Sequence, residues 1–135
     1  PRSSSAASDV YKRQALYKLG VHQFALEQNA AAAETFNHLV NAFPDNQTYL
    51  RYLGLSEYRN KNYSACVESW GKILRGLESG TEPWFEARYY ELDSLRRLNR
   101  DRAQKIWKQF QVLHPKIPYD NWKTKFDALA TSLAL

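Results

Sequence analysis

The sequence predicts an all-α solenoid built from three helix hairpins followed by a C-terminal capping helix. Three observations lead to this prediction. A pattern of apolar and small residues recurs at a spacing of about 34 positions. The 135 residues include only five glycines and five prolines, which favours helices over a loop-rich fold. Apolar residues also recur at steps of three and four, the spacing of one buried helix face.

The repeat is clearest between residues 15–36 and residues 49–70. Residues of the same kind match at a constant offset of 34, in the pairs Leu16–Leu50, Leu19–Leu53, Gly20–Gly54, Phe24–Tyr58, Ala32–Cys66, Phe36–Trp70 and Leu39–Ile73. A third copy follows at an offset of 37 from the second, in the pairs Leu53–Tyr90, Tyr58–Leu95, Cys66–Ala103, Trp70–Trp107 and Ile73–Phe110. The three added residues fall in the linker 76–84, where glycine and proline allow a longer turn.

The residue type at each repeat position has a physical reason, because a helix hairpin must bury its inner faces. Glycine suits the place where two helices cross closely, at Gly20 and Gly54. Small residues let the second helix approach the first, at Ala32, Cys66 and Ala103. Aromatic residues fill the space between neighbouring hairpins, at Phe36, Trp70 and Trp107. One hairpin cannot bury its faces alone, so about three must stack.

Over residues 15–115 this pattern resembles the tetratricopeptide repeat (TPR). The Ala-x3-Phe element of that family is similar to the small residue followed by an aromatic in all three copies. Leu-Gly precedes it in the first two copies, and Pro44 and Pro115 close the first and third. The resemblance implies a right-handed α-solenoid of TPR-like hairpins and a C-terminal fragment of a TPR protein.

Helical patterns run in order along most of the chain. They cover residues 13–27, 30–42, 47–60, 63–77, 82–98, 100–113 and 119–133. Turn-forming residues separate them, such as Pro44 before Asp45 and Asn46, and Gly80 before Thr81. The predicted repeats are therefore about 15–45, 46–78 and 82–115. The last pattern, 119–133, is expected to cap the open end of the stack, with a truncated fourth repeat as the alternative.

Residues 1–14 are rich in serine and alanine and fit no repeat. We expect them to be a disordered or artefactual leader before a TPR-like domain at 15–135. The chain also contains no methionine, so we expect a fragment or a processed form. Three basic residues and one acidic residue in the leader supply +2 of the formal charge of +5, which weakens the case for a nucleic-acid partner.

Composition and motifs argue against several classes of function. No apolar run approaches the ~18 residues that span a bilayer. The single cysteine, Cys66, excludes an internal disulfide and a cysteine-based metal site. The chain lacks the phosphate-binding, zinc-protease and serine-hydrolase motifs, and its three histidines lie far apart. We expect no enzyme activity, no cofactor and no metal. The chain should be soluble, either cytoplasmic or, if an upstream signal is missing, periplasmic.

The family resemblance implies a protein-binding module, because first helices of TPR hairpins line a concave groove. The implied groove residues are Tyr17, Lys18, Arg51, Tyr52, Leu55, Tyr58, Arg59, Arg88, Tyr89, Leu92 and Arg96. The inward positions also include the apolar residues Val21, Phe24, Ala25 and Leu95. Tyr and Arg dominate binding hot spots, and Arg can hold a carboxylate. We expect a protein or peptide partner, acidic and carrying apolar side chains. The alternative for the apolar members is that they are core.

Two other functions stay open. One is binding of nucleic acid or an anionic surface by the basic turn 95–108, through Arg97, Arg100, Arg102 and Lys105. A solvated turn is the alternative there. The other is a structural subunit that stacks on further repeats or self-associates through the face near residues 15–42.

Overall fold

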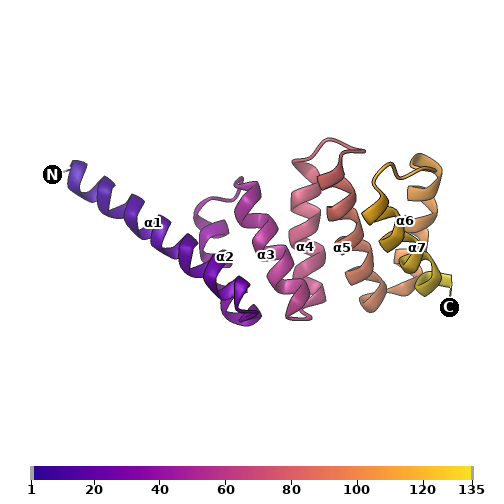
Figure 1. The fold of residues 1–135 in the computed structure, drawn as a ribbon, viewed down its shortest axis with the longest axis horizontal. Coiled ribbons are helices and arrows are strands. Elements are labelled where there is room, and N and C mark those ends of the chain that lie inside the picture. The colour runs from indigo at the N-terminus through magenta and orange to yellow at the C-terminus, as the bar shows by residue number, and fades with distance from the viewer. Residues whose placement is uncertain (1, 135) are drawn as a thin grey trace. The chain divides into compact units, whose positions relative to one another are not determined.

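The computed structural model describes residues 2–134, and these residues form seven α-helices and no strand (Figure 1). The helices are α1 (Arg2–Ala25), α2 (Asn29–Ala42), α3 (Gln47–Arg59), α4 (Tyr63–Arg75), α5 (Glu82–Leu98), α6 (Arg100–Leu113) and α7 (Asp120–Ala134). They form two compact units: α1 to α3 lie in the first, and α4 to α7 lie in the second. The predicted all-α helical-repeat class is confirmed. The repeat boundaries stay predictions.

Helix α1 differs from the expectation for the N-terminus, because residues 2–14 are helical rather than disordered. This segment contains no glycine or proline, and five of its 13 residues are alanine, arginine or lysine, which favour helix. Extending an existing helix is also far easier than nucleating one. The artefactual origin of the segment stays a prediction.

Asparagine side chains begin three of the helices. The Oδ1 atoms of Asn46, Asn62 and Asn99 accept hydrogen bonds from the backbone N–H of the residue three positions later. Each bond satisfies one of the backbone donors that a helix leaves free at its first turn. The polar residues of the turns therefore fix where α3, α4 and α6 start.

In the first unit, α2 packs between α1 and α3. Ala32 and Phe36 on α2 are fully buried, and a Cβ at Gly20 on α1 would lie only 2.8 Å from the Phe36 ring. The ring of Phe36 stacks on that of Tyr52 from α3, with centroids 4.8 Å apart. Gly20 therefore lies at a close helix crossing, as the sequence predicted.

In the second unit, α5 packs against α4, α6 and α7. Cys66 on α4 is fully buried and its Sγ lies 3.0 Å from the Ser94 hydroxyl of α5, which donates to it. Helix α7 buries one face against α5 and α6, formed by Trp122, Phe126, Leu129 and Leu133. The helical spacing of these four residues predicted that face correctly.

Candidate protein-binding surfaces

Three aromatic rings of the first unit contact one another at its surface. Tyr17 and Phe24 project from α1, and their ring centroids lie 6.1 and 5.2 Å from that of Tyr52 on α3. The guanidinium of Arg59 lies 3.8 Å above the Phe24 ring. We call these four residues the α1–α3 surface. The structure thus brings together Tyr17, Tyr52 and Arg59, three of the residues predicted from sequence.

Contacts within the first unit hold the side chains of this surface in place. Tyr52 stacks on the buried ring of Phe36 with an interplanar angle of 5°. The guanidinium of Arg59 also donates a hydrogen bond of 3.4 Å to the backbone oxygen of Phe24. Burial raises the pKa of the Tyr17 hydroxyl, and the neighbouring Tyr52 raises it further. The surface is therefore formed before any partner binds.

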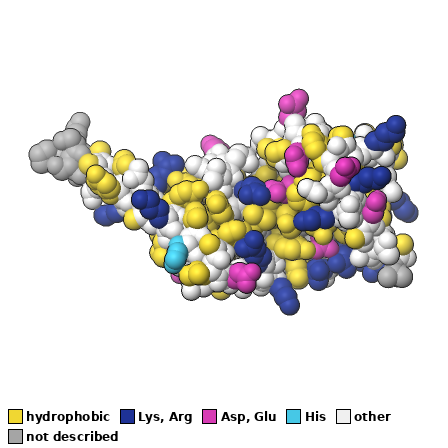
Figure 2. Space-filling model, viewed as in Figure 1, with side chains coloured by type: hydrophobic (Ala, Val, Ile, Leu, Met, Phe, Trp, Pro, Cys, Tyr) yellow, Lys and Arg dark blue, Asp and Glu magenta, His cyan; other side chains and the backbone are white. Residues whose placement is uncertain are grey.

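A hollow of about 380 Å³ lies along α1 beside Tyr17. Val21 and Ala25 supply apolar lining, and the exposed Lys18 adds a positive charge. Arg51 on α3 is also exposed. Figure 2 shows hydrophobic side chains reaching the surface along α1 next to Lys and Arg. Apolar groups and positive charge therefore occur together on this unit.

Some predicted groove residues are interior. Leu92 and Leu95 belong to the core of the second unit and are 0% and 5% exposed. Leu55 is 9% exposed, and Tyr58 is half-buried. The two leucines of α5 and Leu55 therefore occupy core positions, which was the alternative stated for the apolar members. Their side chains are not available to a partner.

The arginines predicted on α5 are neutralised by their own helix. A guanidinium nitrogen of Arg88 lies 2.6 Å from Glu91, and one of Arg96 lies 2.8 Å from Asp93. Both acids stand three residues from their partner, the spacing at which helical side chains meet. Glu91 and Asp93 were not predicted from the sequence as partners of these arginines, although this spacing could have revealed them. These carboxylates therefore offset the positive charge of both arginines.

Tyr89 lies beside α7, with its ring centroid 5.9 Å from Trp122 and 5.6 Å from Phe126. Lys125 lies above Tyr89 and Trp122, with its Nζ 5.7 and 4.8 Å from their centroids. Lys125 was not predicted from the sequence as a site residue. Its spacing of three from Trp122 places both on one side of α7, which was the available signal.

The basic turn is only partly available to an anion. Arg97 lies 3.6 Å from an Asp93 oxygen and 4.8 Å from the centroid of Tyr63. Arg100 donates a hydrogen bond to the backbone oxygen of Ser132 near the end of α7. The other two predicted residues of the turn are exposed, namely Arg102 and Lys105. Two of the four cations therefore make contacts that stabilise the fold.

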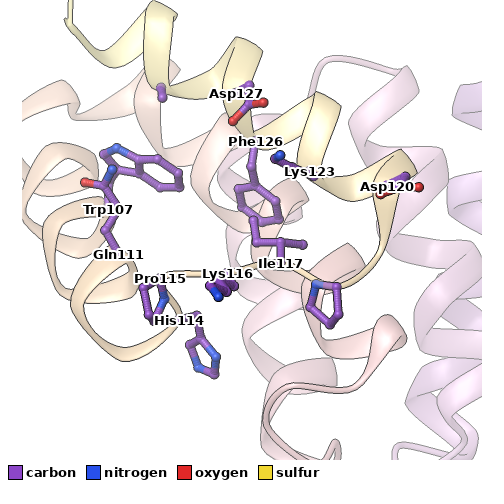
Figure 3. A pocket seen from close by; sticks show the side chains of 12 residues that line it. Trp107, Gln111, His114, Pro115, Lys116, Ile117, Asp120, Lys123, Phe126 and Asp127 are labelled. Carbon is purple, nitrogen blue, oxygen red and sulfur yellow. The ribbon is translucent and has the colours of Figure 1, made fainter.

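A cleft between α6 and α7 was not predicted from the sequence. It encloses about 740 Å³, and Trp107 and Phe126 lie in it with stacked rings 5.9 Å apart (Figure 3). Lysines and aspartates stand at its rim, at Lys116, Asp120, Lys123 and Asp127. The cleft has an apolar floor and a rim of mixed charge, so its electrostatics favour neither sign of ligand.

Within residues 2–134, no helix is long and apolar enough to cross a bilayer. The described side chains also include no cluster of histidine, cysteine or carboxylates suited to a metal ion.

Comparison with known protein families gives a match to part of the chain. Residues 14–46, which include the end of α1 and all of α2, match the family described as Tetratricopeptide repeat. No curated protein matches the chain. Repeats of this family generally mediate protein–protein interactions and are typically not catalytic. The match covers about a quarter of the chain, and together with the all-helical fold it supports a TPR-like helical repeat.

Proposed function

We propose that this protein binds a peptide segment of a partner protein through the α1–α3 surface, without catalysing a reaction. One observation carries the proposal. Tyr17, Phe24 and Tyr52 form a partly exposed aromatic patch, and the Arg59 guanidinium carbon lies over the Phe24 ring at 3.8 Å from its centroid. Aromatic residues and arginine are the residue types that supply most of the binding energy at protein interfaces.

The chemistry of this surface favours an acidic peptide that carries an apolar side chain. Arg59 over the Phe24 ring and Lys18 in the hollow beside Tyr17 place positive charge at the patch, and a guanidinium binds a carboxylate through two parallel hydrogen bonds. The hollow beside Tyr17 offers Val21 to an apolar side chain. Because the rings are already packed, little conformational entropy is lost from the protein on binding.

Selection of peptides from a random displayed library against the full chain tests the proposal. We expect enrichment of acidic peptides that contain an aromatic or aliphatic residue. The Arg59→Met variant keeps the packing on Phe24 but removes the charge. It should weaken the selected peptides by about fivefold or more, since hot-spot truncation costs over ~1 kcal/mol.

Lys72→Gln is the matched control for this experiment. Lys72 is an exposed cation on α4, in the other unit, and it pairs with Glu68 at 3.4 Å. Its removal should leave peptide affinity unchanged. Peptides without acidic residues, or equal affinity for Arg59→Met and the parent chain, would overturn the proposed surface.

A specific observation also favours self-association as a second candidate. Tyr11, Leu19 and Leu26 are 71%, 47% and 56% exposed. At about 100° per residue, Tyr11 and Leu19 lie roughly 80° apart around α1, and Leu26 directly follows the end of this helix. Sedimentation velocity over a range of concentrations tests this face. Association that the Leu19→Ser and Leu26→Ser double variant abolishes would support it, and a monomer at every concentration would exclude it.

A further inference from the structure

Three aromatic rings of the second unit converge on one cation. The Nζ of Lys125 lies over the rings of Trp122, Tyr89 and Tyr90, at 4.8, 5.7 and 6.0 Å from their centroids. A single atom can lie over three rings only where three ring faces meet around it. We call Tyr89, Tyr90 and Trp122 the aromatic corner.

The angles between the rings support this geometry. The interplanar angles are 80° between Tyr89 and Tyr90, 76° between Tyr90 and Trp122, and 50° between Tyr89 and Trp122. The rings therefore form walls of a corner and not a parallel stack. Each ring face carries the negative part of an aromatic quadrupole, so their attraction for a positive charge adds.

Packing behind the corner fixes these rings independently of Lys125. Tyr90 stacks on the fully buried Trp70, with centroids 5.0 Å apart. Tyr89 packs edge-on against the fully buried Phe126 at 5.6 Å. Trp122 is itself only 8% exposed. Removal of the Lys125 side chain should therefore leave the positions of the three rings unchanged.

Lys125 is a poor match for the site that it occupies. Two of its three distances lie near ~6 Å, the outer limit for a cation–π contact. Its side chain is exposed, and a primary ammonium is a strongly hydrated, compact charge on a flexible stem. A hollow of about 430 Å³ adjoins Trp122 and Lys125, and the carboxylate-bearing Glu82 lines it. The open space beside Trp122 and Lys125, with the carboxylate of Glu82 in its lining, therefore leaves room for a larger cation on the Trp122 side of the corner.

We propose that the aromatic corner binds a quaternary ammonium group of a ligand, and that Lys125 occupies the corner when the ligand is absent. A trimethylammonium group is weakly hydrated and touches all three ring faces with its methyl groups, so it leaves water more readily than the lysine ammonium does. As a tethered competitor, Lys125 lowers the apparent affinity of the ligand. This proposal uses different residues from the α1–α3 surface and does not depend on it.

Nuclear magnetic resonance titration of the full chain tests the proposal, with the indole N–H of Trp122 as the reporter. The first probe is tetramethylammonium, which should shift this signal. A peptide with trimethyl-lysine and a soluble phosphocholine then distinguish the two common sources of the group. The same peptide with a neutral tert-butyl group in place of the trimethylammonium reports the role of charge and should bind at least tenfold more weakly.

Variants separate binding from folding. Tyr89→Leu should reduce affinity for tetramethylammonium at least tenfold, whereas Tyr89→Phe keeps the ring face and should bind like the parent. Lys125→Gln should increase affinity severalfold because the competitor is gone. Lys123→Gln, an exposed lysine on the same helix that lines the other cleft, is the matched control and should change nothing. Equal binding of the neutral peptide, or weaker binding by Lys125→Gln, would overturn the proposal.

Discussion

Replacing Gly20 by alanine tests the close helix crossing that the repeat pattern predicts. The new Cβ would lie 2.8 and 2.9 Å from two atoms of the Phe36 ring and 3.1 Å from a methyl carbon of Thr35. Contacts below about 3.0 Å are closer than packed carbon atoms tolerate. Phe36 is fully buried and stacked on Tyr52, so the ring has little room to move away.

Two opposing effects set the size of the change. Overpacking of a well-filled core costs about 1–3 kcal/mol. Alanine in place of glycine inside a helix recovers about 1 kcal/mol of helix propensity. The Gly20→Ala change should therefore lower the free energy of unfolding by about 0–2 kcal/mol, with the destabilising effect dominant. Gly71 on α4 provides the opposite case, because its added Cβ would meet only a Glu91 oxygen at 3.9 Å.

Urea unfolding followed by circular dichroism measures both variants against the parent chain. We expect Gly20→Ala to unfold at lower urea and Gly71→Ala at equal or higher urea, by up to about 1 kcal/mol. The paired design removes helix propensity as an explanation, since both changes gain it equally. If Gly20→Ala were as stable as Gly71→Ala, the close approach of α1 to Phe36 would be refuted.

Two further changes test other parts of the fold. The pKa of the Tyr17 hydroxyl is raised by burial and by Tyr52, so the folded chain keeps its proton above the ordinary value of about 10. Stability should therefore fall as pH rises above about 10, and less so in Tyr17→Phe, measured by urea unfolding across that range. Asn99→Ala removes the cap bond to the Arg102 N–H and should cost about 1 kcal/mol, with faster amide exchange in the first turn of α6.

The buried skeleton could be predicted from the sequence because its positions recur. Ala32 and Cys66 are fully buried, and so are Phe36 and Trp70. The two residues of each pair lie 34 positions apart, at the same position of the repeat. Each position is defined by contacts within a hairpin, so residue size at a fixed spacing carries the information. For this reason, the periodicity of the sequence predicts the burial of these four residues.

The charge of the binding surfaces could not be predicted in the same way. Arg88 and Arg96 were assigned to a basic groove by their position, but the structure pairs them with Glu91 and Asp93. The spacing of Lys125 places it beside Trp122 on α7, but its position over the two α5 rings depends on how α7 packs against α5. Repeat position thus indicates which residues face outward, and tertiary packing decides which of them keep their charge available.

We expect an aromatic patch and a basic side chain, which occur in both units, to give opposite ligand preferences in the two. Arg59 is fixed to the α1–α3 surface by its hydrogen bond to a backbone oxygen as well as by the Phe24 ring, so it remains there and attracts an anion. Lys125 is exposed and lies over ring faces that would accept another cation in its place. Arg59 stays in place and therefore adds positive charge to its site. Lys125 can be displaced, so its position over the rings indicates that this site prefers to bind a cation. The charge of the bound ligand should therefore differ between the units, and substitution of the basic residue should weaken binding at Arg59 and strengthen it at Lys125.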